Sequence, residues 1–152
     1  MRIITNLRMQ LGFSLIEALV ALIVLSVGML GIAALYGQGL SAARTALYRT
    51  IAVYLAAEMA DRIRANRLAR AGYDAAGAPN ACGPGGGTDC TPAQLAASDK
   101  LVWSTLVGRE LPGGVGTVVF TPGTPPTYTI TVRWQDVTGA AQYRIAPQIP
   151  AL

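Results

Sequence analysis

The chain begins with a short polar stretch and then becomes uniformly apolar. Residues 1–12 include Arg2 and Arg8, and no charged residue occurs from Ala18 to Ala43. As a helix, that apolar run would span about 39 Å, enough to cross the roughly 30 Å hydrocarbon core of a bilayer. The pattern predicts a membrane-spanning helix, for which an ordinary anchor or a secretory signal peptide is the simplest interpretation.

One carboxylate stands at the beginning of the apolar run. Glu17 lies immediately before Ala18 and five residues after Gly12. An ionised side chain drawn into or against hydrocarbon costs a few kcal/mol, so such groups usually have a partner or a function. Neither a plain anchor nor a signal peptide needs this acid, and Glu17 therefore favours a more specific role.

After Ala43 the apolar pattern becomes amphipathic. Apolar residues recur at three- and four-residue steps, which predicts a helix with one buried stripe. The stripe is expected to comprise Leu47, Ile51, Tyr54, Leu55, Met59 and Ile63. Because no proline occurs from Phe13 to Ala78, we expect one continuous helix from Phe13 to about Asn66.

Arginines gather near the end of this expected helix. They are Arg62, Arg64, Arg67 and Arg70. Such a cluster is able to bind phosphates or nucleic acid. However, Glu58 stands four residues before Arg62, Asp61 stands three before Arg64, and no aromatic residue interleaves. These spacings favour helix-surface ion pairs, so we interpret the cluster as a solvated face or a contact with neighbouring subunits.

A loop is expected from Gly72 to Thr91, where glycine, proline, asparagine and alanine dominate. It contains the only two cysteines, Cys82 and Cys90. Two thiolates without a nearby histidine make a poor zinc site, so a disulfide is the better interpretation. A disulfide implies an oxidising compartment.

A second, shorter helix is expected after this loop. Thr91 is suited to the N-cap, Pro92 to the first helical position, and Gln94 completes a capping box. Its apolar face would comprise Leu95, Val102, Trp103 and Leu106. Gly108 and then residues 112–114 mark its end.

The remainder is strand-like. Residues 115–121 are rich in β-branched side chains, and apolar Tyr128, Ile130, Val132 and Trp134 alternate with threonines and an arginine. A third strand is expected at 142–145. We expect a small antiparallel sheet packed on the helix stripe, with Tyr128, Trp134 and Trp103 in the core.

Composition limits the chemistry. The chain has 152 residues, of which 52% are hydrophobic and 13% charged, with a net charge of +4 and no histidine. The serines therefore lack a histidine base, and the carboxylates of the carboxy-terminal part are few: Asp74, Asp89, Asp99, Glu110 and Asp136. Two of these could form a glycosidase pair. We nevertheless expect no enzyme, no cofactor and no metal.

The run Gly12-Phe13-Ser14-Leu15-Ile16-Glu17, followed by an apolar helix, resembles the class III signal of type IV prepilins and pseudopilins. In that family a membrane peptidase cuts after the glycine and methylates the new terminus. The resemblance implies cleavage between Gly12 and Phe13, N-methylation of Phe13, and a role for Glu17 in fibre assembly and register.

The resemblance also implies a fold and an organisation. The fold would be α+β and pilin-like: a long amino-terminal helix, whose first half is transmembrane, packed on a small antiparallel sheet with one extra short helix. Residues 1–12 would form the leader and 13–43 the transmembrane or fibre-core half. Residues 44–70 would form the amphipathic half, and 71–152 a globular periplasmic head.

Three further segments, residues 59–67, 90–97 and 128–134, resemble PilV-type minor pilins. This implies a minor pilin that primes pilus assembly or sits at the fibre tip. An I-type minor pseudopilin of type II secretion is the alternative, and a membrane-anchored periplasmic enzyme is a remote one.

The implied partners are the prepilin peptidase/methyltransferase, other minor pilins, the major pilin, the inner-membrane assembly platform and, before assembly, membrane lipid. No residue specifies a nucleic-acid or adhesive ligand, and both stay open. The chain would cross the bacterial inner membrane once, with its amino terminus cytoplasmic and its head periplasmic, before it enters the pilus fibre or tip.

Overall fold

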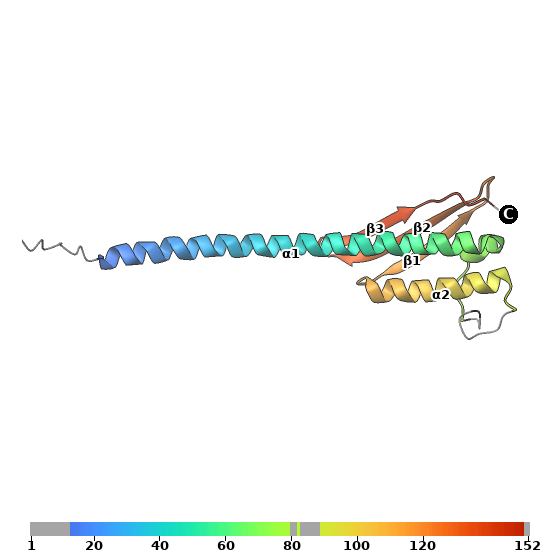
Figure 1. Ribbon diagram of the computed structural model, residues 1–152, viewed down its shortest axis with the longest axis horizontal. Coiled ribbons are helices and arrows are strands. Elements are labelled where there is room, and N and C mark those ends of the chain that lie inside the picture. Colours follow the sequence, from blue (N-terminus) through green and yellow to red (C-terminus); the bar gives the residue numbers. More distant parts are fainter. Residues whose placement is uncertain (1–12, 80–81, 83–88, 151–152) are drawn as a thin grey trace, which may run out of the picture. The chain divides into compact units, whose positions relative to one another are not determined.

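The computed structural model describes residues 13–79, 82 and 89–150. The chain divides into two compact units, with the boundary between Ser41 and Ala42. Within these described ranges, six elements follow one another (Figure 1). They are helix α1 (Leu15–Ala65), the 3-10 helix η1 (Arg67–Tyr73), helix α2 (Pro92–Glu110) and strands β1 (Val115–Thr121), β2 (Thr127–Asp136) and β3 (Gly139–Ile145).

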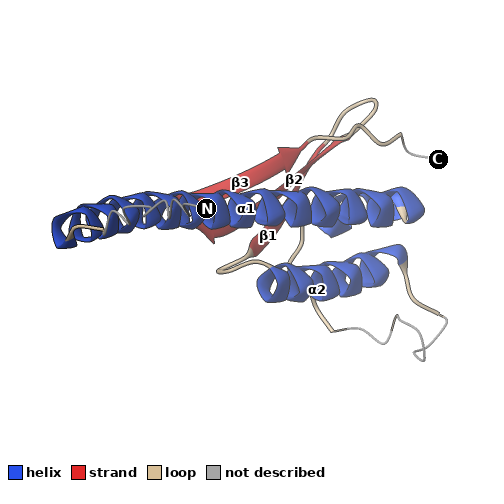
Figure 2. Cartoon of the chain, turned by 60° about the vertical axis from the view of Figure 1, so that its left-hand side comes forward, coloured by secondary structure: helices blue, strands red, loops and turns tan. Residues whose placement is uncertain are grey.

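The three strands form one antiparallel sheet in the order β1-β2-β3 (Figure 2). Val118 of β1 stands opposite Ile130 of β2, and Val132 of β2 stands opposite Tyr143 of β3. The apolar positions of β2 are buried, whereas Arg133 and Gln135 are exposed. Thr131 between Ile130 and Val132 is also buried, so the alternation is interrupted there; elsewhere it is what a sheet with one face on the core requires.

The core of the second unit joins the later part of α1, α2 and the sheet. Its largest fully buried side chains include Trp103, Tyr73, Tyr128, Leu55 and Met59. Trp134 is also buried, so the prediction that both tryptophans and Tyr128 are core residues is confirmed. The layout as a whole is α+β and pilin-like, as expected.

One close approach in this core requires a glycine. A Cβ atom added to Gly116 of β1 would overlap the six-membered ring of the Trp103 indole. Close-packed interiors do not tolerate such an overlap. The indole of α2 therefore occupies the space that a side chain on β1 would need.

The expected buried stripe of α1 is wrong at two positions. Leu47 is 56% exposed and Tyr54 is 67% exposed. The buried positions of α1 are instead Ala52, Leu55, Ala56, Met59, Ala60 and Ile63. Three alanines at four-residue steps let neighbouring elements approach the helix closely, and this turns the side that carries Leu47 and Tyr54 outward.

Helix α2 begins as predicted. The side chain of Thr91 accepts a hydrogen bond from the Gln94 backbone N–H (3.3 Å), and the Gln94 side chain accepts one from the Thr91 N–H (2.9 Å). The expected apolar face is wrong at Val102, which is 53% exposed. The helix continues through Gly108 to Glu110.

Two segments differ from expectation. Helix η1 is not predicted by the apolar pattern, and within it Arg70 has φ 44°, a conformation that non-glycine residues adopt rarely. Strand β3 begins at Gly139 rather than at residue 142, because Gly139 (φ 121°) completes the tight turn that pairs it with Asp136.

The predicted disulfide between Cys82 and Cys90 is confirmed, with Cα atoms 5.9 Å apart. The glycine run between the cysteines lies outside the described residues.

Candidate functional site

The side chains of the first unit are exposed all round the helix. Every residue from 13 to 40 is exposed, and among the large hydrophobic side chains Leu15 (91%) and Phe13 (83%) are the most exposed. Within the described residues, α1 is the one helix long and apolar enough to cross a membrane. Because each Å² of apolar surface costs about 25 cal/mol in water, this helix needs a covering of lipid or protein.

The beginning of α1 carries the predicted site residues. The carbonyl of Ser14 accepts hydrogen bonds from the backbone N–H groups of Glu17 (3.0 Å) and Ala18 (3.2 Å), which closes the first turn. Glu17 therefore lies where the positive end of the helix dipole favours a carboxylate. Phe13 precedes the helix, about one turn from Glu17. Gly12 and the rest of the expected leader lie outside the described residues.

Glu17 has no ion-pair partner among the described residues. The four ion pairs found there all lie between residues 58 and 110. A carboxylate at the end of an apolar helix therefore has no cation from the described part of its own chain.

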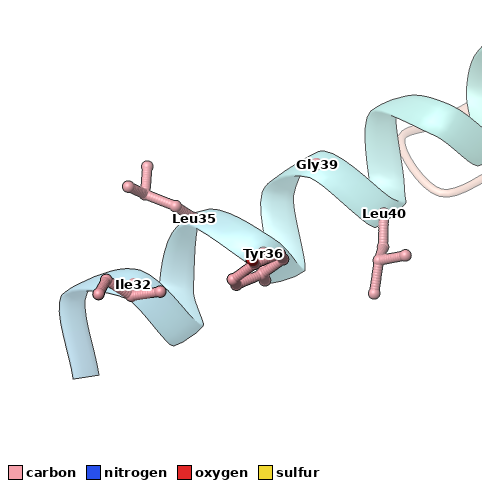
Figure 3. Close-up of a pocket in the computed structure, with 5 residues that line it drawn as sticks. All are labelled: Ile32, Leu35, Tyr36, Gly39 and Leu40. Atoms are coloured by element: carbon pink, nitrogen blue, oxygen red, sulfur yellow. The ribbon is translucent and has the colours of Figure 1, made fainter. Parts of the chain in front are cut away.

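Farther along the first unit, the helix surface has a shallow apolar hollow of about 410 Å³. Its lining is Ile32, Leu35, Tyr36, Gly39 and Leu40, and Figure 3 shows these residues along successive turns of one helix. Gly39 leaves an open space, because a Cβ atom there would meet nothing within 4 Å. A hollow of this size and composition can accommodate an apolar side chain of a neighbouring molecule.

In the second unit, the candidate charges are held in a network. The guanidinium of Arg62 contacts Glu58 Oε1 at 2.7 Å and Asp99 Oδ1 at 2.8 Å, which joins α1 to α2. Burial alone would lower the pKa of Arg62, but hydrogen bonds and charges from both carboxylates more than offset it and raise that pKa. The expected ion pairs Glu58–Arg62 and Asp61–Arg64 are both present.

Tyr73 extends this network into the core. Its side chain is fully buried, and its hydroxyl lies 3.0 Å from Asp99 Oδ2 and 3.1 Å from the carbonyl of Arg62, either of which can accept its proton. Burial raises the pKa of Tyr73 well above its usual value, and the negative charge of Asp99 raises it further.

Most of the remaining candidate carboxylates have structural contacts. Asp74 Oδ2 accepts from the Phe120 N–H (3.4 Å), Glu110 pairs with its neighbour Arg109 (2.9 Å), and Asp136 Oδ1 accepts from the Thr45 hydroxyl (3.0 Å). Across the described ranges, no three His, Cys, Asp or Glu side chains cluster so that they could hold a metal ion.

Comparison with known proteins gives one match. Residues 7–33 match the family described as the prokaryotic N-terminal methylation motif. No curated protein and no solved structure matches the chain. The matched segment contains Gly12, Phe13 and Glu17. It supports a type IV pilin-like protein of a pilus or pseudopilus, with prepilin-type processing and inner-membrane anchoring through the apolar helix.

Proposed function

We propose that this chain is a minor pilin of a type IV pilus, of the PilV type, that takes part in priming fibre assembly or in forming the fibre tip. The observation that carries the proposal is the coincidence of the methylation motif at 7–33 with an apolar helix whose side chains are exposed from 13 to 40. Such a surface is covered by lipid before assembly and by neighbouring helices afterwards.

In this proposal the prepilin peptidase removes residues 1–12 and methylates Phe13. Cleavage after Gly12 creates a cationic amine one helical turn from Glu17. Inside a fibre of low dielectric constant, a buried carboxylate needs a cationic partner. Glu17, which has no such partner within the described part of its own chain, would pair with the terminal amine of an adjacent subunit, and this pairing would set the axial register.

The same proposal assigns a topology. The amino terminus lies in the cytoplasm, residues 13–43 span the inner membrane, and residues 44–152 face the periplasm. The disulfide between Cys82 and Cys90 supports this direction, because the periplasm is oxidising. From there the chain joins other minor pilins and the major pilin at the assembly platform.

A minor pseudopilin of type II secretion is the alternative, since the methylation motif serves both machines. The resemblance of residues 59–67, 90–97 and 128–134 to PilV-type pilins favours the pilus. Deletion of the gene that encodes this chain separates the two functions. The pilus proposal predicts fewer surface fibres and normal protein secretion, whereas the alternative predicts normal surface fibres and reduced secretion.

Intact-mass analysis of the chain from membranes and sheared fibres tests the processing. The expected mature mass lacks residues 1–12 and includes one added methyl group and one disulfide. Gly12→Leu should remain as full-length precursor, whereas Gly39→Ala, at a position with open space, should be processed normally. A mature terminus other than Phe13 would contradict the proposal.

A further inference from the structure

The apolar stretch of α1 is followed by a residue suited to a membrane–water boundary. Residues 18–35 carry no charged side chain and rise about 27 Å as a helix. Within them the hydroxyl of Ser26 donates to the carbonyl of Ile23 (2.8 Å), so it needs no water. Tyr36 comes next and is 72% exposed. Tyrosine favours the headgroup level, and hydrocarbon is about 30 Å thick, so Tyr36 marks one boundary when Glu17 lies at the other.

Arg44 is the first charged residue beyond this boundary. It follows Tyr36 by about 12 Å along α1. Side chains of a helix tilt towards its amino terminus, and an extended arginine reaches about 6 Å beyond its Cβ atom. The guanidinium of Arg44 can therefore lie about 6 Å from the hydrocarbon. The headgroup layer is roughly 5–7 Å thick, so the cation reaches the level of the lipid phosphates.

The guanidinium of Arg44 has no anionic partner among the described residues. It is exposed, and none of the ion pairs found there includes it. The carboxylate held beside this turn of α1 is that of Asp136. Its Oδ1 accepts from the Thr45 hydroxyl (3.0 Å) and from the Val137 N–H (2.7 Å). Arg44 is therefore available to an external anion, and its planar fork of donors suits a phosphate.

The same contacts bring the sheet to this level of the helix. Thr45, next to Arg44, ties the turn between β2 and β3 to α1 through Asp136. Val137 lies in that turn and is 62% exposed. Binding to a lipid surface combines burial of apolar groups with attraction of cations to anionic headgroups. An exposed valine and an unpaired arginine at one level of α1 supply both.

We propose that Arg44 binds the phosphate of an anionic phospholipid at the Tyr36 end of the membrane-spanning helix, before assembly, and that this contact holds the β2–β3 turn with Val137 against the headgroups. This inference rests on the proposed function through the membrane-spanning segment. Arg49 is also exposed and outside the ion pairs of the described residues, but it lies about 20 Å beyond Tyr36. Its guanidinium stays outside the headgroup layer, which makes Arg49 the matched control.

Native mass spectrometry of the chain purified from membranes tests the lipid contact. The chain is held in detergent with added phosphatidylglycerol, or with diacylglycerol, which has the same acyl chains but no phosphate. We expect one phosphatidylglycerol bound per chain and no comparable binding of diacylglycerol. Arg44→Gln should reduce the bound phosphatidylglycerol at least fivefold. Arg44→Lys should retain most of it, and Arg49→Gln should match the parent.

Spin labelling tests the position of the turn. A nitroxide is attached at Val137→Cys or, as a control, at Val119→Cys of β1, where the native side chain is 49% exposed. Cys82 and Cys90 are joined to each other, so the label attaches at the new thiol. Transfer from detergent to phosphatidylglycerol vesicles should reduce the access of a water-soluble relaxation agent at least threefold at position 137 and leave it unchanged at 119. Arg44→Gln should restore access at 137.

Several outcomes would overturn the inference. They are equal binding of phosphatidylglycerol by the parent and Arg44→Gln, an equal loss in Arg49→Gln, binding of diacylglycerol as strong as that of phosphatidylglycerol, and unchanged access at position 137. The same mass spectra report removal of the leader. A processed chain without a preference for phosphatidylglycerol rejects this inference alone, whereas an unprocessed chain rejects the proposed function.

Discussion

The indole Nε1–H of Trp103 on α2 donates a hydrogen bond of 2.8 Å to the backbone carbonyl of Leu55 on α1. Both residues are almost completely buried. The bond fixes the position of α2 along the axis of α1. The same indole ring occupies the space beside Gly116 of β1. Trp103 therefore contacts both α1 and the sheet and helps to set how closely α1, α2 and the sheet pack.

Replacing Trp103 with phenylalanine should destabilise the second unit by about 1–3 kcal/mol, because the variant loses a buried hydrogen bond and leaves a void. The change in the free energy of unfolding is measured by urea unfolding of the full chain in mild detergent, monitored by near-ultraviolet circular dichroism. Val102→Ala alters the adjacent, half-exposed position of the same helix and should shift stability by less than about 0.5 kcal/mol.

Gly116→Val should destabilise the protein by about 1–3 kcal/mol, because any Cβ atom there overlaps the Trp103 ring. The matched control is Gly108→Ala on α2, where the nearest atom to an added Cβ is a carbonyl oxygen 3.7 Å away. Alanine is the better helix former, so the control should be neutral or slightly stabilising. Equal effects of the two changes on the urea midpoint would contradict the packing described.

Arg62→Met should cost about 1–3 kcal/mol, since it leaves Glu58 and Asp99 partly buried without their shared donor. Arg64→Met removes a pair with Asp61 whose side chains are 52% and 72% exposed, and it should cost less than about 0.5 kcal/mol. Parallel denaturation curves of the two variants give the comparison. A loss at Arg64 as large as that at Arg62 would be inconsistent with the network.

Tyr73 should make the protein less stable at alkaline pH. Its pKa is raised in the folded state, so above pH 10, its ordinary value, the unfolded chain loses this proton while the folded chain keeps it. The stabilisation is complete below that pH and is lost as pH rises further. Tyr73→Phe should lose a hydrogen bond at neutral pH but show a shallower decline above pH 10.

Comparing the parent with Tyr73→Phe cancels the contribution of Lys100, whose pKa burial lowers and whose effect on stability has the opposite sign. If the free energy of unfolding fell with the same slope above pH 10 in both proteins, the Tyr73 hydroxyl would have the same pKa in the folded and the unfolded chain.

Replacing both Cys82 and Cys90 with serine should lower stability by about 2.5 kcal/mol, the chain-entropy value for a loop of this length. Under the proposed processing, removal of the leader should not change, because both cysteines lie far along the chain from the bond between Gly12 and Phe13. A thiol assay on unreduced parent protein should find no reactive thiol, and two reactive thiols would rule out the bond.

The elements that the sequence predicts well are those whose signals are local. The capping residues of α2 and the alternation of threonine with apolar residues in β2 depend only on neighbours along the chain, and both are found as expected. The apolar run and Glu17 likewise mark the candidate assembly segment through residue type and spacing alone.

The orientation of α1 is less predictable, because the side chain of Tyr54 has a larger apolar surface than that of Ala56 and would be expected to be buried first. The structure buries Ala56 and exposes Tyr54. Which residue faces inward depends on how closely the sheet and α2 approach, and this is a property of tertiary packing. Alanines at positions 52, 56 and 60, in register with Leu55, Met59 and Ile63, are the signal in the sequence that could have shown it. The exposure of Tyr54 is unpredicted for the same reason.

The last half-cystine, Cys90, is followed directly by Thr91, the residue that caps α2. The covalent link and the capping box therefore meet at a single point of the backbone. The capping box satisfies the first backbone N–H groups of α2 without help from the bond, and the bond restrains the residue just before the cap. Reduction of the bond would therefore lengthen the preceding loop and leave the start of α2 defined by its cap.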